Sequence, residues 1–504
     1  MLNPLYESFF QKNHSSEKIF LLLKNNNKIS YKDFICLIEK ISFFFKEKGL
    51  IPGDRVALKL KKSHHFLAIY GACIRNGLIF LPLNDSYTTD ELTYFLNDSE
   101  SKLLITDRET FLNLKNKKFH HSLFIEILEP DGSGFIKDNL TNTVNYERPV
   151  KRQLNDVAAI LYTSGTTGKS KGAMITQENL ISNAKTLKDY WNFTSHDNLI
   201  HSLPIYHTHG LFVATNIILL SSAKMIFLEK FDIDELINFL PIATVLMGVP
   251  TYYSRLLDSK KLTKLLVKNI RLFISGSAPL TKEINDEFFK KTGKKILERY
   301  GMTETNMISS NPYYGERISG TVGYPLPNIN VRIIDSCSGK LLSKGKIGEI
   351  QVKGKNVFKG YWRMSDKTAN SFTKDGFFKT EDLGFFDKNG YLEIVGRLKD
   401  LIISGGFNIY PKEIENVINS IKGIKESAVI GIPHRDLGEA VFSIIIREKE
   451  SKLNSKKISD FMNKKLAKYK CPKAIIFKDS LPKNNLGKIL KNKLREEYFN
   501  FFKK

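Results

Sequence analysis

Residues 157–172 read VAAILYTSGTTGKSKG, an apolar run followed by a loop of glycines, hydroxyls and lysines. The run Val157–Tyr162 has the length and composition of a buried strand. In the loop, small residues let the backbone approach a polyphosphate closely, while N–H, O–H and ammonium groups donate to its oxygens. The stretch therefore predicts a strand that leads into a phosphate-binding loop.

Two other interpretations of this loop are possible. A Walker A loop requires glycine at the position of Thr163, so the loop does not match that nucleoside-triphosphatase motif. Taken without its neighbours, a loop rich in serine, threonine and glycine is also compatible with a flexible surface turn. The choice between a phosphate loop and a surface turn depends on motifs elsewhere in the chain.

Hydrophobic periodicity in the first part of the chain alternates between helical and extended spacing. Helices are expected over residues 31–48, 65–75 and 89–96, and strands over 55–58, 78–83 and 103–106. This alternation is typical of an α/β fold, in which helices cover sheets of largely parallel strands. Past Gly345, alternating segments at 348–352 and 390–395 predict a β-rich subdomain.

A compact unit is expected after Arg397. Its pattern predicts helices at 412–421 and 456–467, and strands at 428–432, 442–446 and 474–477. We therefore expect an N-terminal domain over residues 1–398 and a small, mobile α+β lid over residues 399–504.

The composition limits the class of protein. With 504 residues, of which 42% are apolar, the chain can form more than one hydrophobic core. The formal net charge of +24 comes from lysines spread along the whole chain and not from one basic stripe, so no nucleic-acid partner is expected. A noncatalytic basic binding protein is the alternative that this charge leaves open.

The chain shows no recognisable targeting signal. Its N-terminus lacks the features of a secretory signal, and no stretch offers about 18 uncharged apolar residues in a row. The four cysteines form no CxxC pair, which favours free thiols in a reducing compartment. We expect a cytoplasmic protein, monomeric or homodimeric, without stable membrane insertion.

Seven further motifs follow the loop along the chain. They are PIYHTHG (204–210), SGSAP (275–279), ERYGMTET (298–305), TEDLG (380–384), GRLKD (396–400), ISGGFN (403–408) and PKNNLGK (482–488). With the loop, they resemble the signatures of the adenylate-forming superfamily, which includes acyl-CoA synthetases, firefly-type luciferases and nonribosomal-peptide adenylation domains. The resemblance covers essentially the whole chain and implies an enzyme that joins a carboxylic acid to AMP, using ATP and Mg²⁺.

The resemblance also implies a nucleotide site. Tyr300 would stack on adenine, and Asp382 would accept the ribose hydroxyls with support from Arg397. Thr303 would bind the α-phosphate, and the carboxylate of Glu304 would bind Mg²⁺. The remaining implied ATP-binding residues are Thr163, Ser164, Gly165, Thr166, Thr167, Gly168, Lys169, Ser277, Ala278, Pro279 and Gly301.

One residue departs from the family pattern. Most members have glycine where this chain has Glu381, directly before Asp382. The extra carboxylate beside the ribose site could weaken ATP binding or point to solvent, and the sequence does not distinguish these two outcomes.

The resemblance further implies a second half-reaction that transfers the acyl group to coenzyme A. Lys488 would be the catalytic lysine that neutralises charge during attack on the α-phosphorus. Lys399 would be the hinge about which the lid rotates. Gly405 and Gly406 would then lie beside the pantetheine tunnel, where missing side chains permit close approach, and His207 would lie near the carboxylate and the tunnel mouth.

The identity of the acid is indicated by a narrower resemblance. The segments LMGVPTYYSR (246–255), YGMTETNM (300–307), SNP (310–312) and GER (315–317) are similar to malonyl-CoA synthetases. A second carboxylate on the substrate requires a buried cation, and Arg255 and Arg317 are the candidates for binding it.

Three alternatives remain at this point. A short- or medium-chain fatty-acyl or aryl-CoA synthetase would line the acid site with apolar residues. A stand-alone adenylation enzyme that loads a carrier protein would share the first half-reaction. A noncatalytic binding protein would be expected to have lost Lys488 or the loop after Thr163, and this chain retains both.

Overall fold

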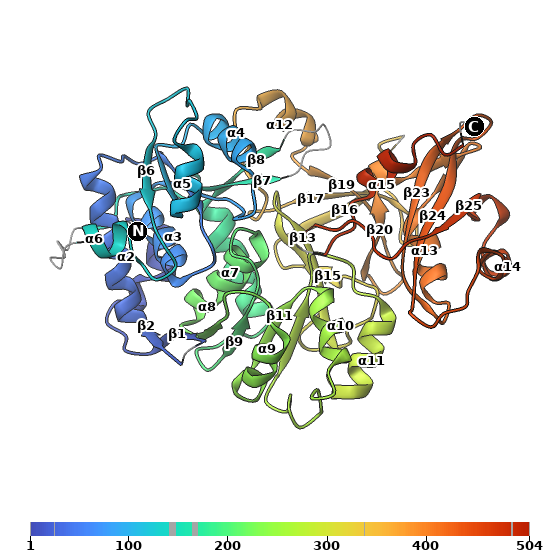
Figure 1. Ribbon diagram of the computed structural model, residues 1–504, viewed down its shortest axis with the longest axis horizontal. Helices are drawn as coiled ribbons and strands as arrows, with labels where there is room; N and C mark the ends of the chain where they lie inside the picture. The colour runs from blue at the N-terminus through green and yellow to red at the C-terminus, as the bar shows by residue number, and fades with distance from the viewer. Residues whose placement is uncertain are drawn as a thin grey trace.

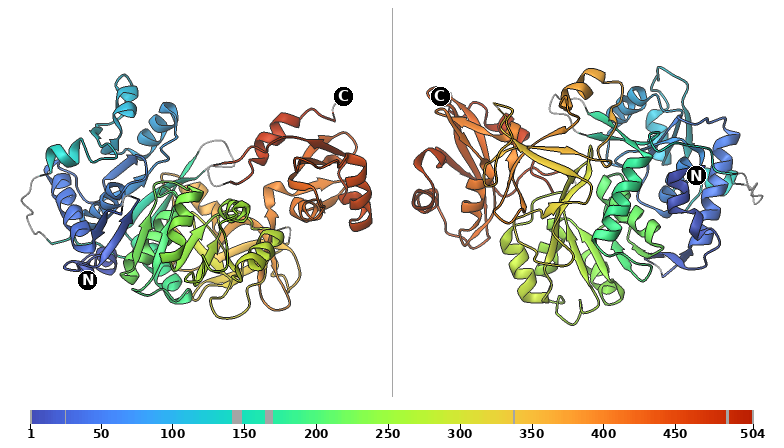
Figure 2. Two further views of the ribbon diagram at one scale, coloured as in Figure 1. Left: turned by 60° about the horizontal axis from the view of Figure 1, so that its bottom comes forward. Right: turned by 180° about the vertical axis from the view of Figure 1, so that it is seen from behind.

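The computed structural model describes residues 2–24, 26–140, 148–163, 170–336, 338–484 and 487–502. Over these ranges the chain forms four β-sheets with helices around them (Figure 1). The two larger sheets lie on the side of the N-terminus, and the sheet formed by the last part of the chain lies at the opposite end of the molecule (Figures 1 and 2).

The nine-stranded sheet is ordered β15-β14-β13-β12-β11-β9-β10-β1-β2. Its strands are β1 (Ile19–Leu23), β2 (Lys28–Ser30), β9 (Asn198–His201), β10 (Lys224–Phe227), β11 (Val245–Gly248), β12 (Leu272–Ser275), β13 (Ile296–Met302), β14 (Asn306–Ser310) and β15 (Tyr324–Pro325). Neighbours from β13 to β1 pair in parallel, whereas β2, β14 and β15 are antiparallel. The carboxyl ends of the parallel strands therefore meet at one edge, the usual ligand edge of such sheets.

The seven-stranded sheet is ordered β18-β8-β7-β4-β3-β5-β6. Its strands are β3 (Arg55–Lys59), β4 (Ile79–Pro82), β5 (Leu103–Thr106), β6 (Phe124–Ile127), β7 (Val157–Thr163), β8 (Lys171–Thr176) and β18 (Gly360–Tyr361). Strands β7 and β8 form an antiparallel hairpin in which Thr163 pairs with Lys171.

Two smaller sheets complete the fold. The first is an antiparallel sheet of β16 (Asn330–Ile334), β17 (Gly348–Lys353), β19 (Phe378–Phe386) and β20 (Leu392–Arg397). The second contains β21 (Ile402–Ser404), β22 (Phe407–Ile409), β23 (Ile424–His434), β24 (Gly438–Arg447) and β25 (Ala474–Phe477). A short 3₁₀ turn, η4 (Leu398–Asp400), joins β20 of the first to β21 of the second.

Helices lie around the sheets (Figure 1). They are α1 (Pro4–Phe9), α2 (Tyr31–Glu47), α3 (His64–Asn76), α4 (Thr89–Ser99), α5 (Arg108–Leu114), α6 (Phe135–Asn139), α7 (Gln177–Tyr190), α8 (Asn216–Ser221), α9 (Ile233–Phe239), α10 (Pro250–Asp258), α11 (Lys282–Thr292), α12 (Ser365–Ser371), α13 (Pro411–Asn419), α14 (Ser455–Lys465) and α15 (Lys491–Tyr498). Side-chain hydrogen bonds cap the N-termini of several helices. For example, the Ser30 side chain accepts a hydrogen bond from the Asp33 amide at the start of α2.

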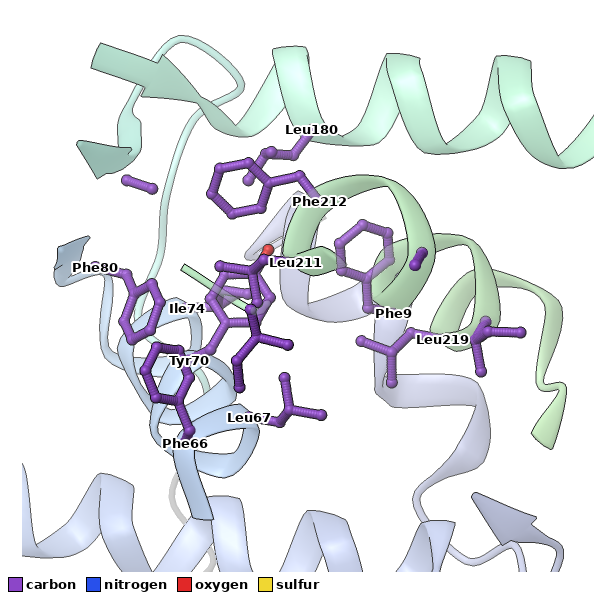
Figure 3. Close-up of a cluster of buried hydrophobic side chains, with 14 of the residues drawn as sticks. Phe9, Phe66, Leu67, Tyr70, Ile74, Phe80, Leu180, Leu211, Phe212 and Leu219 are labelled. Carbon is purple, nitrogen blue, oxygen red and sulfur yellow. The ribbon is translucent and has the colours of Figure 1, made fainter. Parts of the chain in front are cut away.

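The largest hydrophobic core lies around α1, α3, α7 and α8 (Figure 3). Tyr70 of α3 packs against Phe80 of β4 and against Phe212, which belongs to the π-helix η2 (His209–Thr215). All three side chains are almost completely buried. Single π-helical turns are often found at functional sites, and this one begins at His209 of the PIYHTHG motif.

The α/β fold class expected from the sequence is confirmed, including the parallel sheets, the β-rich part and the small C-terminal α+β unit. Strand β5 has the expected bounds, and α2 ends one residue before the expected position. Within the described residues, none of the helices combines the length and the apolar character needed to cross a membrane.

Candidate active site

A cluster of three polar side chains forms one face of the site. Tyr300 on β13 donates a hydrogen bond through its hydroxyl to Oδ2 of Asp382, at 2.5 Å. Arg397, which pairs with Asp382 across β19 and β20, places its Nε 3.1 Å from Oδ1 of the same carboxylate. Burial, followed by the charge of Asp382, raises the pKa of Tyr300 well above its usual value. The structure therefore brings together three residues that the sequence assigns to adenine and ribose.

The loop after β12 forms a second face. Ser277 has a left-handed backbone (φ 69°), and its Oγ lies 3.2 Å from Nδ1 of His209. Ala278 and Pro279 continue the same loop. Gly301 of β13 has no room for a side chain, because a Cβ there would lie 2.0 Å from the carbonyl oxygen of Asn306.

A buried carboxylate and a lysine mark a third part of the site. Glu304, in the turn between β13 and β14, accepts a hydrogen bond from the Tyr361 hydroxyl at 3.0 Å, and burial raises the pKa of its carboxyl. Lys171 is close enough for its charge to favour the ionised form of Glu304. Thr303 lies in the same turn as Glu304, and Thr163 ends β7 opposite Lys171. Ser164, Gly165, Thr166, Thr167, Gly168 and Lys169 lie outside the described residues.

The C-terminal unit reaches this site through the turn that carries Lys488. Gly487 lies against α10, since a Cβ there would be 3.2 Å from Cγ2 of Thr251. Part of the Lys488 side chain is exposed to solvent. The surrounding protein nevertheless lowers its pKa to about 8, first through desolvation and then through the positive charge of Arg397. The negative charge of Asp382 opposes this shift. Lys488 therefore shares its surroundings with the Tyr300–Asp382–Arg397 cluster.

The turn η4 carries the sequence-predicted hinge residue. Lys399 is exposed, and its neighbour Asp400 accepts a hydrogen bond from Nη2 of Arg495 at 2.7 Å. Gly405 and Gly406 form the exposed turn between β21 and β22, with φ values of 56° and 82°. The Gly405 amide donates a hydrogen bond to the carbonyl oxygen of Leu437, within the C-terminal unit.

Two histidines belong to the PIYHTHG motif, and the second, His209, contacts Ser277 of the loop after β12. Burial lowers the pKa of His207 to about 4, so its imidazole is neutral near pH 7. His209 is buried too, and burial followed by the positive charge of Arg299 holds its pKa well below the usual range. Within the described part of the chain, Nε2 of His209 has no hydrogen-bond partner.

Arg255 is exposed and Arg317 is half-buried, so neither is the fully buried cation expected from the sequence. Arg255 is exposed on α10, where its guanidinium lies over the ring of Phe231. Arg317 instead donates hydrogen bonds to backbone carbonyl oxygens of Lys295, Pro312 and Tyr313. The outward phase of α10 leaves Arg255 exposed, and backbone carbonyl oxygens already accept hydrogen bonds from the guanidinium of Arg317.

Sequence reasoning missed a different arginine, which is buried beneath the SGSAP loop. Arg299 is 4% exposed, and a Cβ on Gly276 would lie 2.4 Å from its Cζ. Burial lowers the pKa of its guanidinium to about 9. Among the described residues, its Nε and Nη2 have no hydrogen-bond partner and no carboxylate forms an ion pair with it. The sequence signal that could have identified Arg299 is its position as a charged residue inside the ERYGMTET motif, directly before Tyr300.

A nucleotide-type face that is closed by a lysine from a separate C-terminal unit defines an adenylate-forming enzyme. The family model of the AMP-binding enzyme matches residues 9–362, and that of the AMP-binding enzyme C-terminal domain matches residues 413–488. The chain therefore belongs to the AMP-binding enzyme family, as an AMP-forming acid–CoA ligase.

Individual relatives agree with this assignment. The malonate–CoA ligase of Arabidopsis thaliana is 34% identical over 489 residues, which are 90% of this chain and 79% of that protein. The long-chain-fatty-acid–CoA ligase of Bacillus subtilis is 30% identical over 505 residues, which are 93% of this chain and 90% of that protein. ATP-bound MatB from Rhodopseudomonas palustris is 48% identical with a TM-score of 0.96, both chains being covered completely. The apo form of MatB gives a TM-score of 0.86, so the present arrangement is nearer to the ATP-bound one.

Proposed function

We propose that this enzyme activates malonate, first as malonyl-AMP and then as malonyl-CoA. A malonate oxygen attacks the α-phosphorus of ATP, and the bond from that phosphorus to the bridging oxygen breaks to release pyrophosphate. The CoA sulfur then attacks the acyl carbon, and AMP leaves with the bonding electron pair. The relatives named as malonate–CoA ligase and MatB support this choice, and the buried guanidinium of Arg299 carries it.

Burial of Arg299 without a partner is the central observation. A buried ion costs several kcal/mol unless it is paired and hydrogen-bonded. Within the described residues the protein supplies no carboxylate to Arg299 and leaves Nε and Nη2 without partners. A substrate with a second carboxylate would provide the missing partner through two parallel hydrogen bonds. Arg299 therefore takes the role that the sequence suggested for Arg255 and Arg317.

Other buried polar groups support a polar substrate. In the described part of the chain, four further buried side-chain atoms, at the end of β12 and in the segment that follows β9, lack hydrogen-bond partners. They are Oγ of Ser202, Oγ1 of Thr208, Nε2 of His209 and Oγ of Ser275. Burying such atoms beside a hydrocarbon chain would leave each one without a hydrogen bond, at a free-energy cost of about 1–3 kcal/mol per atom. The site therefore suits a small dicarboxylate better than a fatty or aromatic acid.

The nucleotide is proposed to bind across the Tyr300–Asp382–Arg397 cluster. Tyr300 would stack on adenine, Asp382 and Arg397 would hold the ribose, and Thr303 would bind the α-phosphate. The carboxylate of Glu304 suits Mg²⁺, because this hard cation takes oxygen ligands and shares them with phosphate oxygens. The ion would neutralise part of the triphosphate charge.

The remaining assignments concern the lid. We place the domain boundary between residues 398 and 399, where η4 separates β20 from the last sheet. Lys488 would stabilise charge on the α-phosphate during adenylation, and rotation at Lys399 would bring Gly405 and Gly406 to the pantetheine path near His207. We further propose that the enzyme works in the cytoplasm.

A panel of acids tests the proposal. AMP release that depends on ATP and CoA should be fastest with malonate and slow with butyrate, hexanoate and benzoate. A preference for hexanoate or benzoate would contradict the malonate proposal and leave the acid–CoA ligase class intact. Replacement of CoA by a phosphopantetheine-bearing carrier protein tests the alternative of a stand-alone adenylation enzyme, and faster acyl transfer to the carrier would favour it.

A further inference from the structure

Glu381 has a backbone conformation that residues other than glycine rarely adopt. Its φ is 59°, in the left-handed region. It lies on β19 where the register with β17 shifts, so the strand bulges between two buried neighbours, Thr380 and Asp382. Residues other than glycine lose stability in this region, and such strain concentrates at functional positions. Glu381 is therefore a candidate for a functional role.

Three lysines surround the Glu381 carboxylate. The Nζ atom of Lys367, on α12, lies 4.0 Å from Oε1 of Glu381. Lys171 of β8 and the hinge residue Lys399 are both close enough for the negative charge of Glu381 to raise their pKa values, against the lowering by burial. These lysines come from three elements, β8, α12 and η4, that meet only in the folded chain.

The same lysines border the expected position of the triphosphate. Lys171 closes the hairpin that begins at Thr163, and it also interacts with Glu304, the proposed Mg²⁺ ligand. A polyphosphate at this position would be attracted by Lys171, Lys367 and Lys399 together. Tight retention of pyrophosphate would delay the hinge rotation, because the second half-reaction requires an emptied phosphate site.

We propose that Glu381 weakens polyphosphate binding at this end of the site and thereby promotes release of pyrophosphate before the lid rotates. Its carboxylate repels the phosphate oxygens and pairs with Lys367 once the anion has left. This inference rests on the proposed placement of the triphosphate beside Lys171 and Glu304. Because Glu381 is 49% exposed, solvent and salt screen the repulsion, and an effect of about three- to ten-fold on affinity is expected.

Three substitutions separate charge from backbone strain. Glu381→Gln removes the charge and keeps the strained backbone, Glu381→Gly removes both, and Glu381→Asp keeps the charge. The measured quantities are the inhibition constant of pyrophosphate, the KM for ATP and the dissociation constant of AMP. Glutamine and glycine should lower the pyrophosphate constant by about three- to ten-fold, while aspartate should resemble the wild type. AMP affinity should change less, since AMP lacks the β- and γ-phosphates.

A matched control variant comes from Arg363. This residue also has a positive φ, of 55°, but its guanidinium pairs with Glu100. Arg363→Gly should alter thermal stability and leave pyrophosphate inhibition unchanged. By contrast, Glu381→Gly should change both thermal stability and pyrophosphate inhibition. Glu381→Gln should change pyrophosphate inhibition only, because the glutamine keeps the strained backbone.

The outcomes distinguish this inference from the placement on which it rests. If Lys171→Ala leaves pyrophosphate inhibition unchanged, the triphosphate does not bind beside Lys171 and the placement fails. If Lys171→Ala weakens pyrophosphate binding but Glu381→Gln has no effect, only the role of Glu381 is refuted. An equal change in AMP and pyrophosphate affinity would also refute it, because the effect would then lie in the nucleoside pocket.

Discussion

Lys488 of the C-terminal unit lies close enough to Asp382 of β19 for the two side chains to interact through their charges. Asp382 is also the carboxylate that contacts Tyr300 and Arg397. A lysine in this position lies beside the residues that are proposed to bind the nucleotide. The arrangement is therefore suited to the first half-reaction, in which negative charge accumulates on the α-phosphate.

Replacement of Lys488 by alanine should separate the two half-reactions. We expect Lys488→Ala to reduce acyl-AMP formation by about 10²-fold or more, as for other preorganised charge-stabilising donors. Conversion of supplied malonyl-AMP to malonyl-CoA should be largely retained, because the proposed rotation at Lys399 moves the C-terminal unit, and Lys488 with it, before CoA attacks. Single-turnover assays of each half-reaction check this, and equal damage to both would show that Lys488 has a general structural role.

The lowered pKa of Lys488 predicts an alkaline limit for adenylation. The ammonium form is the active one, and its pKa in the free enzyme is about 8. The value of kcat/KM for adenylation should therefore fall as the pH rises through about 8. Bound triphosphate favours the charged lysine, so the corresponding limb in kcat should lie at higher pH. Lys488→Arg should lack this limb, because the guanidinium stays protonated; persistence of the limb in that variant would assign it to another group.

Rotation at Lys399 is tested by fixing its backbone. Lys399→Pro restricts φ to about −65°, which should prevent the turn from taking up a second conformation. ATP–pyrophosphate exchange is expected to survive, while CoA-dependent turnover should collapse. Full overall activity in the proline variant would place the hinge elsewhere in the chain.

The contact between Gly276 and Arg299 predicts a substrate-selective defect. A methyl group at residue 276 would lie 2.4 Å from the guanidinium carbon and must displace it. Gly276→Ala should therefore raise the KM for malonate much more than the KM for ATP. Steady-state kinetics with each substrate varied in turn check this result, and an equal rise in both constants would indicate general misfolding of the loop.

Local patterns were sufficient to predict many of the elements. Leu103–Thr106 is a short apolar run between polar residues, and it forms β5 with the expected bounds. The exposure of Arg255 could also have been inferred, because Tyr252, Tyr253 and Leu256 define the buried face of α10. That helical phase conflicts with a buried role for Arg255, which was instead suggested by the motif resemblance.

The role of Arg299 could not be predicted in the same way. Its neighbours Gly276 and His209 come from segments that follow β12 and β9, and only the pairing of the parallel strands brings them to one edge. Similarly, the strain at Glu381 depends on a bulge in the pairing of β17 with β19. Both features are set by long-range contacts, which a single sequence does not reveal.

The ratio of kcat/KM for malonate to kcat/KM for butyrate, in the wild type and in Arg299→Met, tests the malonate proposal most directly. The wild type should favour malonate by roughly 10⁴-fold, because butyrate leaves a buried guanidinium unpaired. Arg299→Met should abolish most of this preference and retain or improve butyrate turnover, whereas Arg255→Met and Arg317→Met should preserve the preference. A wild-type preference for butyrate, or an Arg299→Met enzyme that still selects malonate, would contradict the account.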